Sequence, residues 1–143
     1  MSQGDIDHFK AAVLEAEQSR QAEPLVSLFA ADATLDSPAH DEPLRGELGA
    51  REFWQDYLHA FQTVKSTFTT THALGDTVVL EWRSEGALPT GRPITYRGAS
   101  ILKFAGGKIA SFVAYYDSAQ FLLETTAAVE MFGTGALNNE GGD

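Results

Sequence analysis

Four strand-like segments follow one another in the second half of the chain, and they restrict the possible folds more than any other feature. The segments are "STFTTTHAL", "TVVLEWRSEGAL", "ITYRGASILKF" and "KIASFVAYYD", all rich in β-branched and aromatic residues. The connections "GD", "PTGRP" and "AGGK" carry turn chemistry, so consecutive strands are expected to pair antiparallel. Because long strands twist, the resulting sheet should curl.

The first half of the chain has helical patterns. Residues 5–19 carry apolar side chains at helical spacing, with Asp5 or Asp7 as a possible cap. "EPLVSLFAADA" is predicted to be a short second helix, "TLDSP" a short strand that ends at Pro38, and "LGAREFWQDYLHAF" a third helix. Helices followed by an antiparallel meander indicate an α+β fold, in which three N-terminal helices pack in the curved sheet and leave a pocket.

Domain organisation is simple in this reading. Residues 1–132 are expected to form one domain, which a helix over "DSAQFLLETTAAVEMF" closes. Residues 133–143, rich in Gly and Asn, are expected to form a flexible tail.

Composition excludes several classes of function. The chain has 20 acidic and 10 basic side chains among 143 residues, a net charge of −10. This balance argues against a nucleic-acid partner and against an anionic membrane surface. The absence of cysteine excludes disulfides and thiolate chemistry, and the four histidines show no paired ligand spacing, so we expect neither a metal nor another cofactor. No segment has the length of a signal peptide core or a membrane span, which predicts a soluble, cytoplasmic protein.

The strand "VVLEWRSEG" leaves two alternatives open. Val78, Leu80 and Trp82 alternate with Glu81 and Arg83, so the two sets lie on opposite faces. In the first alternative, the apolar face joins the core and the charges meet solvent. In the second, the charges point into the pocket, and a second copy of the chain covers Trp82 on the convex face. Glu81 would then be a base, and Arg83 would hold a substrate oxygen.

Several motifs together resemble a known family. "LFAADATLDSP", "LRGELGAREFW" and "ILKFAGGKIASFVAYYD" are similar to the SnoaL-like branch of the nuclear transport factor 2-like superfamily, over nearly all of residues 5–126. The resemblance implies a cone-shaped, cystatin-like α+β fold with a pocket for a small, largely apolar, oxygenated molecule. It also implies a homodimer through the convex sheet face. The fold hosts isomerases, cyclases and hydrolases as well as non-catalytic binders.

A residue-by-residue comparison with ketosteroid isomerases of this fold predicts that steroid isomerisation is absent. Their aspartate base corresponds to Ser37, and their second carboxyl donor corresponds to Ser100. Their three tyrosines correspond to Val13, Phe29 and Trp54. Serine is a poor base, and valine cannot donate a proton.

Two further comparisons concern charged residues. Limonene-epoxide-hydrolase-like enzymes carry an Arg-x-Asp pair before an "ALPTG" turn, and this chain has the pair in reverse order as Glu81 and Arg83; their second aspartate corresponds to Ala114. SnoaL-like cyclases often place an acid at the end of the last strand, where this chain has Asp117. The alternative for Asp117 is a helix cap, since "DSAQ" resembles a capping box.

Candidate catalytic residues are therefore Glu81, Arg83 and Asp117. The candidate substrate-binding residues come from three sources. Strand parity gives Tyr96, Ser100, Phe112 and Tyr116, and the apolar stripe of the third helix gives Trp54 and Tyr57. The resemblance to ketosteroid isomerases implies Ser37. The expected function is cofactor-independent acid–base chemistry of the isomerase, cyclase or hydrolase type on a small molecule. The alternative is a non-catalytic module for ligand binding or dimerisation.

Overall fold

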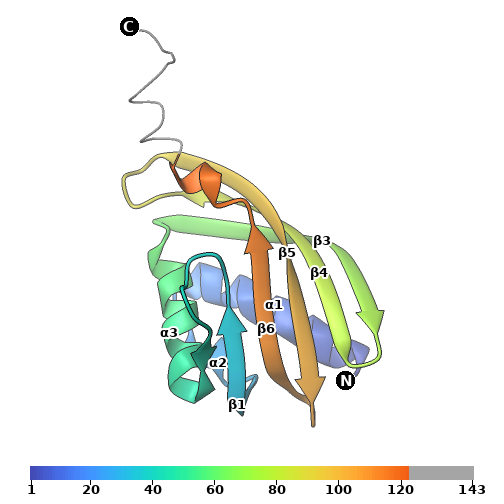
Figure 1. Ribbon diagram of the computed structural model, residues 1–143. Helices are drawn as coiled ribbons and strands as arrows, with labels where there is room; N and C mark the ends of the chain where they lie inside the picture. Colours follow the sequence, from blue (N-terminus) through green and yellow to red (C-terminus); the bar gives the residue numbers. More distant parts are fainter. Residues whose placement is uncertain (123–143) are drawn as a thin grey trace, which may run out of the picture.

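The computed structural model describes residues 1–122, which form three helices in the hollow of a curved six-stranded sheet (Figure 1). In chain order the elements are α1 (Gln3–Ser19), α2 (Glu23–Val26), β1 (Phe29–Asp36), β2 (Leu44–Arg45), α3 (Gly46–His59), β3 (Thr63–Leu74), β4 (Thr77–Ala87), β5 (Pro93–Ala105), β6 (Lys108–Tyr116) and the 3₁₀ helix η1 (Ser118–Leu122).

The strand order is β2-β1-β6-β5-β4-β3, and β3 to β6 form the predicted antiparallel meander. The prediction of a wholly antiparallel sheet is wrong. β1 pairs parallel with β6, so the sheet is mixed. β4 and β5 stay in continuous register from Thr77↔Lys103 to Ala87↔Pro93. Figure 1 shows these long strands bending over α1, which confirms the expected α+β cone.

The second helix is shorter than predicted, because sheet pairing takes over part of its sequence. α2 ends at Val26, and β1 begins at Phe29 opposite Ile109 of β6. The Ile109 N–H donates to the Leu28 carbonyl at 3.0 Å, so this backbone is bound to the sheet. Tertiary pairing of this kind overrides local helix preference.

The ends of the first and last helices also differ from the prediction. α1 begins at Gln3, and Ser2 is its cap: the Ser2 hydroxyl accepts from the Asp5 N–H, while the Asp5 carboxylate accepts from the Ser2 N–H. This reciprocal pair is a capping box. The predicted closing helix starts as η1, and its remainder and the predicted tail lie outside the described residues.

β4 turns its apolar side toward the helices. Val78 and Leu80 are fully buried, and Ser84 is 1% exposed, whereas Glu81 and Arg83 are exposed on the outer face. Trp82 lies half-buried on the inner side, where its ring contacts Tyr96. The first alternative for this strand is therefore correct.

Candidate functional site

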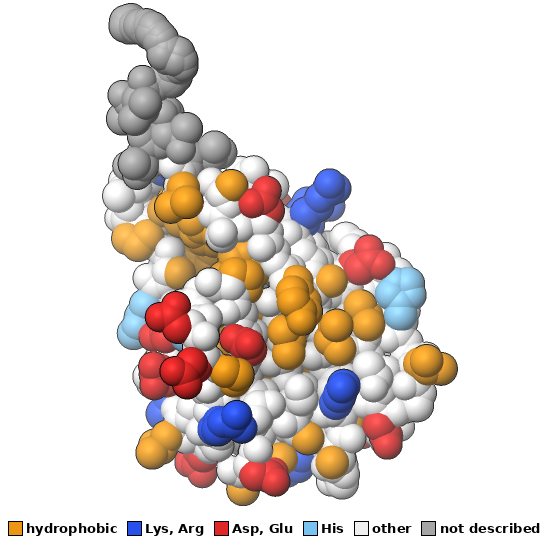
Figure 2. Space-filling model, in the orientation of Figure 1, with side chains coloured by type: hydrophobic (Ala, Val, Ile, Leu, Met, Phe, Trp, Pro, Cys, Tyr) orange, Lys and Arg blue, Asp and Glu red, His pale blue; other side chains and the backbone are white. Residues whose placement is uncertain are grey.

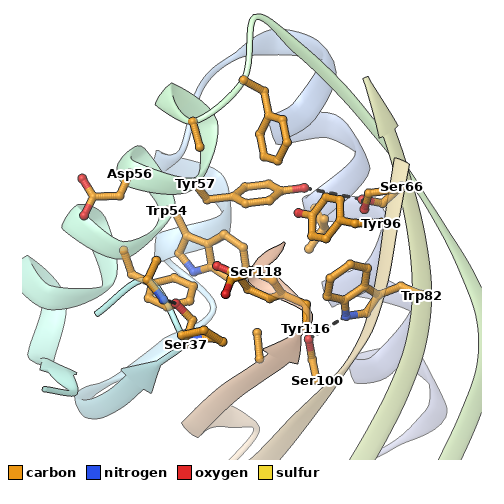
Figure 3. A pocket seen from close by; sticks show the side chains of 18 of the residues that line it. Ser37, Trp54, Asp56, Tyr57, Ser66, Trp82, Tyr96, Ser100, Tyr116 and Ser118 are labelled. Atoms are coloured by element: carbon orange, nitrogen blue, oxygen red, sulfur yellow. Dashed lines mark hydrogen bonds between the residues drawn. The ribbon is translucent and has the colours of Figure 1, made fainter. Parts of the chain in front are cut away.

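A cavity of about 350 Å³ lies between α1, α3 and the concave face of the sheet (Figure 3). All seven residues predicted to bind substrate line it: Ser37, Trp54, Tyr57, Tyr96, Ser100, Phe112 and Tyr116. The wall is mainly aromatic. The ring of Tyr96, for example, lies 5.3 Å from Trp82, 5.4 Å from Tyr116 and 5.0 Å from Phe121 between centroids. This volume and lining are typical of a site for a small, largely apolar molecule.

Glu81 and Arg83 do not line this cavity, so the alternative in which they point inward as catalytic residues is wrong. The Glu81 carboxylate lies 2.7 Å from Nε2 of His72 on the neighbouring strand β3, and Arg83 pairs in register with Arg97 of β5. Both side chains are exposed on the outer face. The physical reason is that the other face of β4 buries Leu80 and the ring of Trp82, and a strand cannot present both faces inward.

Asp117 is likewise outside the cavity. It is exposed, and its carboxylate accepts from the Ala119 N–H at 2.9 Å at the start of η1. This bond is the local side-chain-to-backbone contact that aspartate forms at helix starts and turns. The structure therefore supports the capping alternative and gives Asp117 no contact with the cavity.

Ser37, His40 and Asp56 form a hydrogen-bonded chain at the edge of the cavity, and all three line it. His40 Nδ1 lies 3.1 Å from Ser37 Oγ, and Nε2 lies 3.2 Å from Asp56 Oδ2. The His40 ring stacks on Phe53, with 5.2 Å between centroids and 25° between planes. Because the Asp56 side chain is 53% exposed and that of His40 is 14% exposed, we call this the open end of the cavity.

The hydrogen bonds at the open end define proton positions. A carboxylate only accepts, so His40 Nε2 donates to Asp56, and in this tautomer Nδ1 accepts from the Ser37 hydroxyl. The Ser37 oxygen also accepts from the Ala39 N–H at 3.2 Å. Burial raises the pKa of Tyr116, which lies in the same wall of the cavity. The arrangement is a serine–histidine–aspartate relay, a geometry suited to moving protons.

A second polar group lies at what we call the buried end of the cavity, formed by Tyr57, Ser66, Ser84 and Tyr96 around Glu17. Glu17 of α1 is only 5% exposed. Its carboxylate accepts from the Tyr57 hydroxyl at 2.6 Å, from the Ser66 hydroxyl at 2.6 Å and from the Ser66 N–H at 2.9 Å. Ser66 Oγ lies 2.6 Å from Ser84 Oγ, and Ser84 is paired with Tyr96 in the β4–β5 register.

The two tyrosines at the buried end stay protonated. Burial is the largest cause that raises the pKa of Tyr57 well above its ordinary value, followed by the charges of Tyr96 and Glu17. Burial also raises the pKa of Tyr96, with smaller contributions from Tyr116 and Glu17. Both phenols therefore act as neutral hydroxyl groups near pH 7.

Two indole N–H groups belong to the cavity wall, and they differ in their partners. Trp82 Nε1 donates to Ser100 Oγ at 3.0 Å. Trp54 Nε1 is buried and has no acceptor among the described residues. An unpaired buried donor is costly, so a ligand oxygen that reached the Trp54 N–H would stabilise the complex.

Glu17 is not among the residues predicted from the sequence, although the sequence contains a signal for its burial. Glu17 follows Val13 by four residues and Phe9 by eight, so it lies on the buried stripe of α1. A carboxylate on such a stripe needs buried partners, and Tyr57 and Ser66 supply them. At the open end, Ser37 and His40 are only three residues apart, so a contact between them could be expected from the sequence. No local pattern links them to Asp56.

The fold and the aromatic cavity define a small α+β cone of the nuclear transport factor 2-like class. The family model for the SnoaL-like domain matches residues 11–112, and the chain belongs to this family. No curated protein matches the chain significantly. Among the described residues, no helix has the length and apolar character to cross a membrane, and no cluster of three or more metal-ligating side chains is present.

Solved structures share this fold. An NTF2-like protein from Anabaena variabilis is 21% identical, with a TM-score of 0.74 over 82% of this chain and 90% of that one. A hypothetical protein with a ketosteroid isomerase-like fold from Catenulispora acidiphila, in complex with trimethylamine, is 24% identical, with a TM-score of 0.72 over 82% and 92%. TerC, co-crystallized with polyporic acid, is 18% identical, with a TM-score of 0.70 over 82% and 94%.

Proposed function

We propose that the cavity binds a small, largely apolar, oxygen-bearing molecule and that His40 moves a proton to or from it through the Ser37 hydroxyl. The observation that carries this proposal is the Ser37–His40–Asp56 relay at the edge of an aromatic cavity. The trimethylamine and polyporic acid complexes of two fold neighbours support the use of this fold for small molecules.

The proton moves in one balanced step. Ser37 takes a proton from a C–H beside a carbonyl group of the ligand while the Ser37 proton passes to His40 Nδ1. Asp56 stabilises the imidazolium that forms, because its carboxylate already accepts from Nε2. The step leaves an anionic ligand oxygen, and the N–H of Trp54 is the buried donor available in the wall. Return of the proton to a different ligand atom would complete an isomerisation.

The test uses β-tetralone, an aromatic ketone of suitable size with acidic protons beside its carbonyl. Deuterium incorporation from heavy water is followed by NMR, and affinity is measured by calorimetry. We expect the wild type to accelerate exchange and His40→Gln to lose about a hundredfold of that acceleration with affinity retained, a typical effect of removing a general base. Asp56→Asn should lose less, since the imidazole remains.

The matched control is His72→Gln, which makes the same substitution on the outer face beside Glu81. Its exchange rate should equal that of the wild type. Binding of β-tetralone without accelerated exchange in the wild type would refute the catalytic proposal and favour the second candidate, a non-catalytic binder. That candidate is favoured by one observation: the positions of the isomerase carboxyl groups hold Ser37 and Ser100.

The outer face of the sheet carries a second feature, an apolar patch of Val79, Ile101, Val113 and Tyr115 on β4–β6, and Tyr115 is 57% exposed (Figure 2). Trp82 does not belong to it, so the reason first given for a dimer fails. The patch is bordered by both signs of charge, including Glu81, so a two-fold-related copy could match opposite charges. We infer that a second copy of the chain covers this face.

Sedimentation velocity tests this dimer. The wild type should sediment as a dimer, and Tyr115→Glu should shift it to a monomer, because a carboxylate would be buried in the patch. Leu48→Glu, at an exposed position of α3, is the control and should remain dimeric. A monomeric wild type at high protein concentration would contradict the inference.

A further inference from the structure

We propose that the buried end of the cavity selects a ligand by a hydrogen-bond donor, a hydroxyl or a protonated amine. The inference rests on the proposed function only in taking this cavity as the ligand site. The inference adds which chemical group of the ligand lies at the buried end, opposite His40. Figure 3 shows Ser37 and Trp54 on the α3 side of the cavity, and Ser66 and Tyr96 on the side of the long strands.

The number of hydroxyl protons fixes the direction of the hydrogen bonds around Glu17. Each hydroxyl has one proton. Ser66 donates its proton to the Glu17 carboxylate, so the 2.6 Å contact between Ser66 Oγ and Ser84 Oγ requires Ser84 to be the donor. Tyr57 donates directly to Glu17.

The protons of Tyr57, Ser66 and Ser84 therefore all point along the chain of hydrogen bonds toward Glu17. The oxygen of Tyr57, which lines the cavity, retains only lone pairs for a ligand. A ligand carbonyl or ether oxygen would meet these lone pairs without a proton between them, which is unfavourable. A ligand hydroxyl or ammonium would supply the missing proton.

Charge acts in the same direction. Within residues 1–122, neither Lys nor Arg forms an ion pair with Glu17, although its carboxylate is buried. Trp82 and Tyr96 line the cavity, and aromatic rings attract cations. A ligand ammonium beside Tyr57 would thus lie one hydroxyl away from the Glu17 carboxylate, whereas an anionic group there would be repelled.

The experiment compares three probes that share one ring system: β-naphthol, its methyl ether, and naphthylmethylamine, which is protonated near neutral pH. Calorimetry measures the affinity of each for the full chain. We expect the hydroxyl and the ammonium probe each to bind roughly tenfold or more tightly than the ether, the effect of one hydrogen bond that the ether cannot donate. The ratio of the affinities for β-naphthol and naphthylmethylamine then shows whether the site prefers a hydroxyl or an ammonium group as the donor.

Glu17→Gln tests the origin of this preference. The glutamine amide keeps the shape of Glu17 but can donate, which frees the Tyr57 hydroxyl to point its proton into the cavity. The preference for β-naphthol over its ether should fall to about twofold or less. Glu15→Gln is the matched control on the exposed side of α1 and should keep the wild-type preference.

The outcomes separate this inference from the proposed function. Equal binding of β-naphthol and its ether to the wild type would overturn the donor selectivity and leave the cavity as a ligand site. A failure of all three probes to bind would contradict the ligand site itself, and with it this inference. Should Glu17→Gln fail to fold, the order of the three affinities in the wild type still decides.

Discussion

Gly98→Ala tests how β4 and β5 place Trp82 inside the cone. Gly98 lies opposite Trp82 in the β4–β5 register and opposite Tyr116 in the β5–β6 register. A Cβ built at position 98 would lie 2.2 Å from the carbonyl oxygen of Tyr115, and 2.7 and 2.9 Å from two carbons of the Trp82 ring. Side-chain rotation cannot remove the contact with a backbone oxygen, so the strands would have to separate.

The cost follows from these distances. Overpacking by a single methyl group typically destabilises by about 1–3 kcal/mol, and a backbone clash places Gly98→Ala near 3 kcal/mol or above. For a domain of this size, that loss lowers Tm by roughly 10 °C. Urea unfolding, followed by circular dichroism, measures the free energy of unfolding directly.

Gly4→Ala is the matched control because it makes the same chemical change without a clash. The added Cβ would lie 3.5 Å from the Ser2 hydroxyl, an ordinary contact, and Gly4 is in the first turn of α1. Alanine favours a helix over glycine, so this variant should be unchanged or more stable by up to about 1 kcal/mol. If Gly98→Ala were as stable as Gly4→Ala, the inward placement of the Trp82 ring against Gly98 would be refuted.

Three other variants test separate parts of the account. Glu17→Ala removes the acceptor of three buried hydrogen bonds and should destabilise by about 3 kcal/mol in urea unfolding; wild-type stability would show that the network is not formed. The double change Glu81→Ala with Arg83→Ala should leave the affinity for β-tetralone and its exchange rate within about twofold of wild type, because both side chains are on the outer face. A larger loss in either quantity would show that these residues contribute to the site. Ser2→Ala removes the α1 cap and should cost about 1 kcal/mol of the free energy of unfolding, and an unchanged value would argue against the capping box.

Local periodicity was sufficient to predict most of the fold. The strands of the meander and the apolar stripe of α3, with Phe53 and Trp54, depend on spacing within each segment, and the structure confirms them. The parallel pairing of β1 with β6 depends on contacts between distant segments, and it converts Phe29 from a predicted helical residue to a strand residue.

The orientation of β4 could not be decided from its own sequence, because both faces carry apolar residues. Val79 lies on the outer face, while Val78 and Leu80 lie on the inner face. The small residue that admits the Trp82 ring, Gly98, is on a different strand. The pair Glu81 and Arg83 was therefore assigned a role that only a three-dimensional arrangement could exclude.

The sequence predicted residues that line the cavity, but it did not predict the two hydrogen-bonded groups around His40 and Glu17. Strand parity placed Tyr96, Ser100 and Tyr116 correctly, since alternation is a local property. The relay at the open end joins His40 of a loop to Asp56 of α3, and that contact exists only after the helix packs on the sheet.

A crystal structure of the chain with β-naphthol tests the central claim most directly, namely that one cavity holds a ligand between the Ser37–His40–Asp56 relay and the Glu17 network. The account predicts the naphthalene rings between Trp54 and Trp82, with the hydroxyl within hydrogen-bond distance of the oxygen of Tyr57 or Tyr96. A ligand bound outside this cavity, or one whose hydroxyl points toward His40 and away from both tyrosines, would contradict it.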